Sequence, residues 1–308
     1  MKVLVTGACG QLGYDVLNEL GYRNFSIVAT DVFDEKDVKF YDKQSFACKA
    51  PYIKLDITDK DAVSSVINSV KPDAVIHCSA WTNVDGAEDE ENRELVYKIN
   101  HKGTENIATS CKAVGAKMLY VSTDYVFSGN GNTPWKPDEK DYNPLNVYGD
   151  SKLQGERAVC STLEKFFIVR TAWVFGINGN NFINTMISAS KKFDTLTVVN
   201  DQIGTPTYTF DLARLLVDMI LTEKYGYYHA TNEGGFISWY DFAVEIFKCA
   251  GYTTKVLPVS TLEYKASKAK RPFNSRLDKS KLKENGFTPL PNYKDALKHY
   301  LNIKLKDL

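Results

Sequence analysis

The sequence has no long hydrophobic run. None of its apolar stretches approaches the roughly 20 residues that a membrane-spanning helix needs. The chain begins directly with an apolar strand instead of a charged and then apolar leader. It also contains no internal repeat, low-complexity tract or flexible linker. We therefore expect an ordinary globular protein of the cytoplasm.

An excess of charge of either sign is also missing. Lys and Arg number 38, Asp and Glu number 38, and the formal net charge is zero. Such a chain has no general attraction to nucleic acid or to an anionic membrane surface. We expect neither of them as a partner.

Cysteine and histidine are few and scattered. The six cysteines include no Cys-x-x-Cys pair, and the four histidines lack the spacing of metal ligands. Small buried side chains in a reducing compartment explain the cysteines better than disulfides or zinc. The sequence therefore predicts no protein-built metal site.

A phosphate-binding pattern is present close to the N-terminus. A β-branched strand over 2–6 leads into the motif GACGQLG at 7–13 and then into an amphipathic helix. The glycines Gly7, Gly10 and Gly13 permit a tight turn, close approach to a pyrophosphate and packing of helix on strand. The helix N-terminus offers N–H groups to the anion. The motif indicates a dinucleotide site, and a purely structural turn is the alternative interpretation.

A second strand, over 26–30, ends on Asp31. At this place a dinucleotide site has a carboxylate that accepts hydrogen bonds from the adenine ribose. Asp31 therefore favours NADH, although Lys36 or Lys39 could accommodate the 2′-phosphate of NADPH. An Asp that merely ends a strand is the alternative.

Strands and helices alternate up to residue 176. We expect further strands over 52–55, 73–78, 117–122 and 166–170, and helices over about 58–70, 91–114 and 146–156, with Leu95 facing inward. Right-handed crossovers make this an α/β fold with a Rossmann-type doubly wound parallel sheet. We expect a dinucleotide-binding domain over 1–176, to which elements of about 195–232 return. A smaller, interleaved substrate-binding lobe is expected over 177–308, mainly about 233–308.

Reactive side chains are expected at the carboxyl edge of this sheet. Thr123 and Asp124 follow the strand over 117–122, and Tyr148 and Lys152 share one helical face. A nearby ammonium lowers the pKa of a phenol, and the same ammonium can hydrogen-bond a ribose. We therefore assign Tyr148 as proton donor, Lys152 as the group that tunes it, and Thr123 as the partner of the reacting oxygen. A surface Tyr and a solvated Lys are the alternative, which the glycine motif upstream disfavours.

The sequence resembles the dTDP-4-dehydrorhamnose reductases of the extended short-chain dehydrogenase/reductase superfamily over nearly its whole length. The segments that carry the resemblance are VTGACGQLG, HCSAWTNVDGAE, INHKGTENIA, STDYVFSG, YGDSKLQGE, VRTAWVFG, NGNNF, DQIGTPT and RPFNSRLD. It implies a domain for NADH or NADPH and a lobe for a deoxythymidine-diphosphate sugar. The implied reaction is reduction of the C4 ketone of dTDP-4-dehydro-L-rhamnose to dTDP-L-rhamnose, with Tyr148 as proton donor.

The resemblance also implies roles for single residues. The nicotinamide nucleotide would contact Gly7, Gly10, Gln11, Leu12, Gly13, Asp31, Asp56, Ile57, Ala80, Thr82, Tyr148 and Lys152. The sugar nucleotide would contact Thr123, Asp124, Tyr148, Trp173, Asn181 and Arg271. A core position for Trp173 and a solvated one for Arg271 and Arg276 are the alternatives. Some members bind magnesium between subunits through glutamates, whereas this chain has Asp15 after the glycine turn. Both that metal and the choice between monomer and homodimer stay open.

Two other functions fit much of the same pattern. One is a sugar-nucleotide epimerase or dehydratase, but dehydratases of the superfamily place Glu after the Thr-Asp pair, where this chain has Tyr125. The other is a regulatory subunit like the methionine adenosyltransferase β subunit, which resembles this family. The intact Thr123, Tyr148 and Lys152 disfavour a purely regulatory role.

Overall fold

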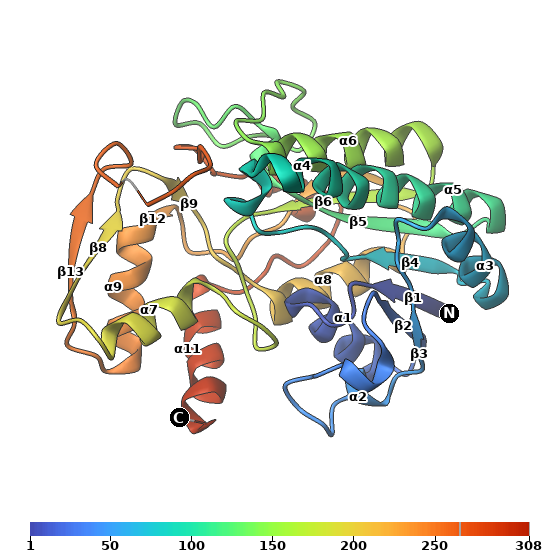
Figure 1. Cartoon of the computed structure of the whole chain (residues 1–308), viewed down its shortest axis with the longest axis horizontal. Helices are drawn as coiled ribbons and strands as arrows, with labels where there is room; N and C mark the ends of the chain where they lie inside the picture. Colours follow the sequence, from blue (N-terminus) through green and yellow to red (C-terminus); the bar gives the residue numbers. More distant parts are fainter. Residues whose placement is uncertain (265, 308) are drawn as a thin grey trace.

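A seven-stranded parallel sheet forms the centre of the computed structural model, which describes residues 1–264 and 266–307. Its strands are β1 (Lys2–Thr6), β2 (Ser26–Asp31), β3 (Tyr52–Lys54), β4 (Ala74–His77), β5 (Lys117–Thr123), β6 (Phe166–Thr171) and β11 (Gly226–His229). Their order in space is β11-β6-β5-β4-β1-β2-β3 (Figure 1). The chain thus starts in the middle of the sheet and builds outward in both directions, which confirms the predicted doubly wound α/β fold.

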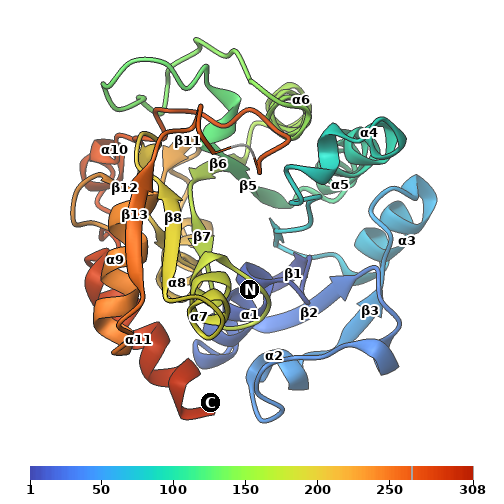
Figure 2. The ribbon, with the colours of Figure 1, turned by 60° about the vertical axis from the view of Figure 1, so that its left-hand side comes forward.

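Helices cover both faces of the sheet (Figure 2). α3 (Lys60–Val70), α5 (Thr104–Val114) and α6 (Val147–Thr162) lie on one face, and α1 (Gln11–Tyr22) and α8 (Thr209–Ile220) lie on the other. Successive residues of a strand point to opposite faces, so that Leu4 packs with the first group while Val3 and Val5 pack with the second. Burial on both faces explains why these strands read as continuous apolar runs.

The helix expected over 91–114 is divided into three parts. α4 (Glu90–Tyr97) and α5 are separated by a π-helical stretch, η3 (Lys98–Gly103). Its wider turns change the phase of the apolar stripe, so that Val96 is buried while Leu95, which we expected to face inward, is 43% exposed. Inside the π turn, Asn100 is fully buried and its Oδ1 accepts a hydrogen bond from the Trp81 N–H at 2.8 Å.

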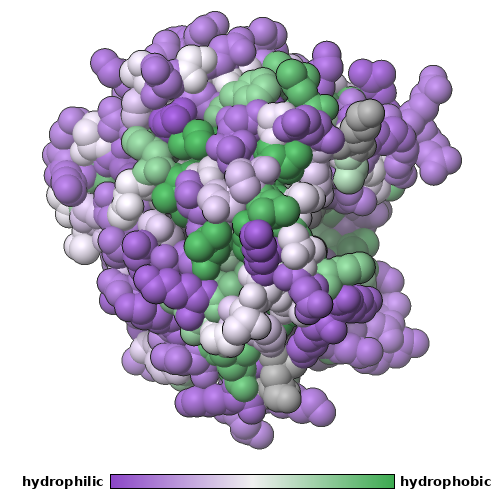
Figure 3. Space-filling model, turned by 90° about the vertical axis from the view of Figure 1, so that its left-hand side faces the viewer, coloured by the Kyte–Doolittle hydropathy of each residue, from purple (hydrophilic) through white to green (hydrophobic). Residues whose placement is uncertain are grey.

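The remaining elements form a smaller lobe and a few short connections. The elements of this lobe are β7 (Val174–Phe175), α7 (Phe182–Ser190), β8 (Thr195–Val199), β9 (Ile203–Gly204), β10 (Thr207–Tyr208), β12 (Ile237–Ser238), α9 (Trp239–Ala250), β13 (Lys255–Val259), α10 (Ser280–Glu284) and α11 (Tyr293–Lys304). The loop after β2 contains only the short helix α2 (Phe46–Lys49) and single turns. The outer face of the lobe is mostly polar, with apolar residues scattered between (Figure 3). No helix in the described residues has the length and hydropathy to cross a bilayer.

The two parts of the chain are interleaved. β11 pairs in parallel with β6, and α8 packs on α1, so that both elements belong to the central sheet and its covering helices. β8, at the start of the segment expected to return, pairs instead with β13 inside the smaller lobe. The return to the central sheet is therefore made by α8 and β11.

Candidate active site

A cleft of about 1070 Å³ lies at the carboxyl ends of the central strands, and elements of the smaller lobe complete its wall. Its lining includes the glycine turn after β1, the ends of β2, β4 and β5, the start of α6, and residues of α7 and α9. Ligand pockets usually measure roughly 300–1,000 Å³. The cleft therefore has room for a dinucleotide together with a second ligand.

The glycine turn forms one end of this cleft. Gly7 has φ +68°, and a Cβ there would lie 2.6 Å from the backbone nitrogen of Ser79. A Cβ on Gly13 would overlap the carbonyl of Gly7, so that α1 can approach β1 only without it. Gly10 begins α1 without any side-chain cap, which leaves the positive end of the helix facing the cleft. This cradle fits the pyrophosphate of a nicotinamide dinucleotide.

The residues expected at the adenosine lie beside this turn. Asp31 ends β2, where its Oδ2 accepts a hydrogen bond from the Cys9 N–H at 2.9 Å and its Oδ1 accepts one from Val32 at 2.8 Å. Its carboxylate is thus fixed across the glycine turn and still borders the cleft. Asp56 and Ile57 line the same cleft, as do Gln11, Leu12, Ala80 and Thr82.

The expected catalytic residues meet in the middle of the cleft. Asn146 caps α6 by accepting a hydrogen bond from Gly149 at 2.7 Å, which places Tyr148 in the first turn and Lys152 one turn later. Lys152 is 3% exposed, and its Nζ donates to the carbonyl of Val121 at 2.7 Å. The same Nζ lies 4.1 Å from the centre of the Tyr120 ring.

Burial governs the protonation of this group. It raises the pKa of the Tyr148 phenol to about 12, although a hydrogen bond with Thr123 acts in the opposite direction. It also lowers the pKa of Lys152 to about 7, against the attraction of Glu156. We expected Lys152 to lower the pKa of Tyr148. The pKa of Tyr148 shows no such effect, because the Lys152 amine is directed at Val121 and Tyr120. The phenol therefore keeps its proton at neutral pH, as a proton donor must.

Asp124 places a carboxylate oxygen without a hydrogen-bond partner beside Thr123 in the middle of the cleft. Thr123 Oγ1 donates to its Oδ1 at 3.1 Å, while its Oδ2 is buried without a hydrogen-bond partner. Burial raises the pKa of this carboxyl to about 7. A buried, unpaired oxygen beside a cleft is a ready partner for a hydroxyl group of a ligand.

Trp173 and Arg271, expected at the sugar nucleotide, both line the cleft. Trp173 has φ +52°, and its ring stacks on Trp239 with centroids 3.8 Å apart. It is a half-buried wall residue, not the core residue of the alternative interpretation. Arg276 does not line the cleft.

Asn181 is an exception among the expected residues, because it does not line the cleft. Its Oδ1 caps α7, and its Nδ2 donates to Gln11 Oε1 at 3.1 Å and to the Gly176 carbonyl at 2.9 Å. The neighbouring Asn180 lines the cleft in its place. Asn181 therefore supports Gln11 of the glycine turn instead of facing a sugar.

Several lining residues were not anticipated from the sequence. Trp239 and Phe182 begin α9 and α7, and Lys98 comes from the π-helical stretch. Trp239 stands in the apolar stripe of α9, and a periodic pattern does not distinguish a core residue from a cleft wall. No sequence pattern marks Lys98 as a lining residue, because the pattern does not predict the π turn that places it at the cleft.

Asp15 is buried between α1 and α8. It is 7% exposed, and the Thr209 hydroxyl donates to its carboxylate. Burial raises the pKa of Asp15 to about 7. The carboxylate thus faces the interior of this chain, between α1 and α8. Within the described ranges, no three His, Cys, Asp or Glu residues are grouped as metal ligands.

Replacing Asp15 by Asn is expected to stabilise the protein at pH 8 and to change little at pH 4. Because the folded pKa of about 7 exceeds the ordinary value of 3.8, the contribution of Asp15 is full below pH 4 and is lost as pH rises to 7. Asn keeps an acceptor for Thr209 and carries no charge. Urea unfolding should show a gain of roughly 2–4 kcal/mol at pH 8, whereas the exposed Asp61→Asn should change the free energy of unfolding by less than about 1 kcal/mol. Equal effects of Asp15→Asn at both pH values would contradict the expectation.

A doubly wound sheet, a glycine turn that fits a pyrophosphate, and Thr123, Tyr148 and Lys152 in one cleft define an oxidoreductase of the short-chain dehydrogenase/reductase type. A family model, the RmlD substrate-binding domain, matches residues 1–305. The dTDP-4-dehydrorhamnose reductase of Aggregatibacter actinomycetemcomitans is 38% identical and aligns over 97% of each chain. The chain belongs to this family, and the resemblance seen in the motifs is confirmed.

Solved structures support the same assignment. A dTDP-4-dehydrorhamnose reductase from Clostridium acetobutylicum is 42% identical, has a TM-score of 0.88 and covers 100% of both chains. The dTDP-4-dehydrorhamnose reductase from Bacillus anthracis, solved in complex with NADP, is 39% identical with a TM-score of 0.86, over 98% of this chain and 99% of its own. That relative therefore binds a nicotinamide nucleotide.

Proposed function

We propose that this protein reduces the C4 ketone of dTDP-4-dehydro-L-rhamnose to dTDP-L-rhamnose, with NADH or NADPH as hydride donor. The observation that carries the proposal is the meeting of Thr123, Asp124, Tyr148 and Lys152 in one cleft beside a pyrophosphate cradle. The names of the full-length relatives support the choice of substrate. An epimerase or dehydratase of the same superfamily is disfavoured by Tyr125, which stands where a dehydratase needs a second acid.

The residues of the cleft divide the chemistry as follows. A bound reduced nicotinamide supplies a hydride to C4. The Tyr148 hydroxyl gives its proton to the carbonyl oxygen, so that C=O becomes CH–OH and a phenolate is left. Thr123 hydrogen-bonds the same oxygen and orients it. The Lys152 ammonium, one turn along α6, stabilises the phenolate and binds the ribose.

We further propose how the two parts of the chain share the ligands. Residues 1–176, together with α8 and β11, would hold the nicotinamide nucleotide at the glycine turn and Asp31. The smaller lobe, mainly 233–308, would hold the sugar nucleotide through Trp239 and Arg271, together with Trp173 of the first part, which stacks on Trp239. Support comes from the positions of Trp239 and Arg271, which line a part of the cleft wall that the glycine turn does not form.

The test is oxidation of NADH or NADPH by the purified protein with dTDP-4-dehydro-L-rhamnose, which is generated in situ. We expect stoichiometric loss of the 340 nm absorbance of NAD(P)H and a sugar nucleotide two mass units heavier than its precursor. If neither nucleotide were oxidised and dTDP did not bind, a regulatory role would become the better explanation. Co-purification with a synthetase would then test that role.

We expect NADH to be preferred over NADPH. The carboxylate of Asp31 is fixed across the glycine turn, where it suits a ribose diol and repels a 2′-phosphate. Lys36 and Lys39 are exposed and do not line the cleft. The ratio of kcat/KM for NADH to that for NADPH should exceed about tenfold, or 1.4 kcal/mol. It should fall towards one in Asp31→Asn, with Asp34→Asn as a matched control. A tenfold preference for NADPH in the wild-type protein would overturn this role of Asp31.

A further inference from the structure

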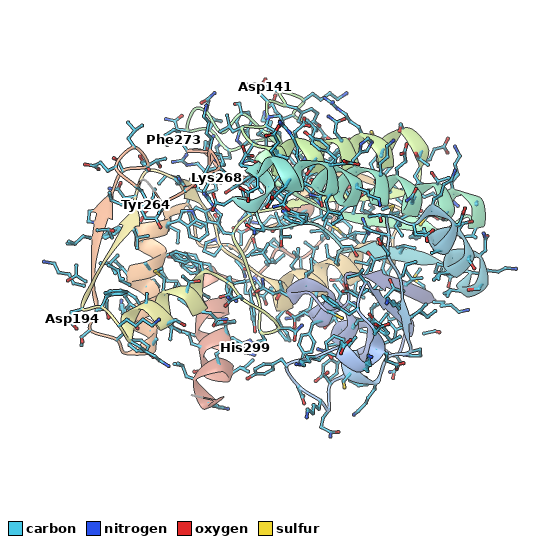
Figure 4. The ribbon with its side chains drawn as sticks, viewed as in Figure 1. Asp141, Asp194, Tyr264, Lys268, Phe273 and His299 are labelled. Atoms are coloured by element: carbon cyan, nitrogen blue, oxygen red, sulfur yellow. The ribbon has the colours of Figure 1, made fainter. Side chains whose placement is uncertain are left out.

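A segment of the smaller lobe reaches across to the central domain. Residues 267–273, which we call the strap, follow β13 and return to the lobe where Ser275 donates a backbone hydrogen bond to Ile203 at 2.8 Å. The middle of the strap meets the loop after β4 and the start of α6, since the carbonyl of Lys270 accepts a hydrogen bond from Asn146 at 2.8 Å. Figure 4 shows Lys268 towards α4, away from Tyr264 and Phe273.

One carboxylate holds the strap in this position. Asp85 Oδ1 accepts backbone hydrogen bonds from Lys268 at 3.0 Å and from Ala269 at 2.9 Å. The Arg271 guanidinium closes the arrangement, with Nη2 to Oδ2 at 2.7 Å and Nη1 to Oδ1 at 3.1 Å. Burial opposes ionisation here, but these bonds to Arg271 and to the backbone lower the pKa of Asp85. Nη1 also donates to the Ser267 hydroxyl of the strap. Asp85 is therefore a carboxylate that binds both terminal nitrogens of Arg271.

Arg271 also lines the cleft. Among the described side chains that line the cleft, the cationic types are Lys98, Lys152 and Arg271. Lys152 is committed to the centre of the cleft, and the glycine turn serves the pyrophosphate of the cofactor. A second diphosphate needs its own cation, and the planar fork of an arginine suits phosphate oxygens.

Arg271 also lies at a suitable distance from the chemistry. It lies beside Tyr125, whose ring packs edge-on against that of Tyr148 with centroids 5.8 Å apart. One aromatic side chain thus separates the guanidinium from the proton donor. A diphosphate at Arg271 would carry its attached sugar next to Tyr148.

We propose that Asp85 is the positioning residue of the substrate diphosphate site, and that it holds the strap so that the Arg271 guanidinium borders the cleft. This proposal rests on the proposed function. An arginine on an untethered segment would have to be immobilised when the ligand binds, whereas Asp85 has already fixed it. Asp85 itself touches neither the reacting atoms nor the cofactor cradle.

The experiment compares Asp85→Asn with the wild-type protein, with dTDP as the binding probe. The amide can still accept from the strap backbone but loses the charged, two-point hold on Arg271. We expect the Kd of dTDP and the KM of the sugar nucleotide to rise about tenfold, while the Kd of NADH stays within about twofold and kcat within about threefold. Arg271→Lys should act in the same direction. The double variant should bind dTDP no more weakly than Arg271→Lys alone, because the two residues act as one unit.

Asp89→Asn is the matched control. It removes the ion pair of Lys268 with Asp89 from the same strap but leaves Arg271 untouched. We expect dTDP binding within about twofold of wild type. The proposal is overturned if Asp85→Asn leaves the Kd of dTDP unchanged or lowers it, if the double variant shows multiplied losses, or if Asp89→Asn weakens binding equally. The proposed function is tested by the turnover and dTDP binding of the wild-type protein, and the role of Asp85 is tested only by the variants. A failure of the proposed function can therefore be told apart from a failure of the role proposed for Asp85.

Discussion

Tyr148→Phe should reduce kcat by about 10²–10⁴-fold, the range that a positioned proton donor contributes. The substitution removes one oxygen atom and leaves the ring in its packing against Tyr125. Because the phenol is neutral in the free protein, its loss removes the proton that the carbonyl oxygen must receive. The Kd of NADH and of dTDP should change little, since neither the glycine turn nor Arg271 is altered. Steady-state kinetics with both substrates, together with the two binding constants, make this measurement.

Tyr97→Phe is a matched control for this substitution. Tyr97 also lies near the start of α6, where its hydroxyl donates to Asp150 at 2.6 Å, but it does not line the cleft. Its variant should keep kcat within about threefold of wild type. The assignment of the proton donor would be wrong if Tyr148→Phe retained wild-type turnover. It would also fail if Tyr97→Phe lost as much activity.

The largest loss of stability is expected from Glu156→Gln. Glu156 and Arg170 form a fully buried ion pair, with Nε to Oε1 at 2.8 Å and Nη2 to Oε2 at 2.7 Å. Arg170 also donates to Tyr142 at 2.8 Å, and its guanidinium carbon lies 4.9 Å from the centre of the Phe127 ring. Removing the carboxylate leaves a buried charge without its counter-ion. The free energy of unfolding should therefore fall by about 3–5 kcal/mol.

Chemical denaturation at neutral pH measures this loss. Glu164→Gln removes a charge from the exposed turn after α6 and should change the free energy of unfolding by less than about 0.5 kcal/mol. Replacing the pair together, as Glu156→Gln with Arg170→Met, should recover part of the loss because no unpaired charge remains. A cost below about 1 kcal/mol for Glu156→Gln would show that water or another group satisfies Arg170.

Much of the fold could be predicted because the strands and helices are specified by patterns within short segments of the sequence. β1, β4, β5 and β6 are buried on both faces and therefore appear as nearly uninterrupted apolar runs. The π turn before α5 has no such signature, and for that reason Leu95 was placed inward. The position of β8 was missed for a similar reason, since an apolar run does not specify which sheet it joins.

The positions of site residues could be predicted from the sequence where the strand topology alone brings those residues together. Parallel strands bring their carboxyl ends to one edge, so that Thr123 and the glycine turn had to meet. Long-range contacts gave no sequence signal. The pairing of Asp85 with Arg271 joins residues 186 positions apart. The orientation of Lys152 towards Val121 likewise depends on side-chain packing that no motif specifies.

β11 has a consequence for how this protein can be made. It comes from late in the chain, yet it covers β6 at the end of the central sheet. Until it is synthesised, β6 has a row of unpaired N–H and C=O groups, which in an open strand promote pairing with other molecules. The nucleotide-binding half should therefore not be produced by cutting the chain at residue 176. Ribosome-bound fragments of that length are the stage at which this protein most needs a chaperone.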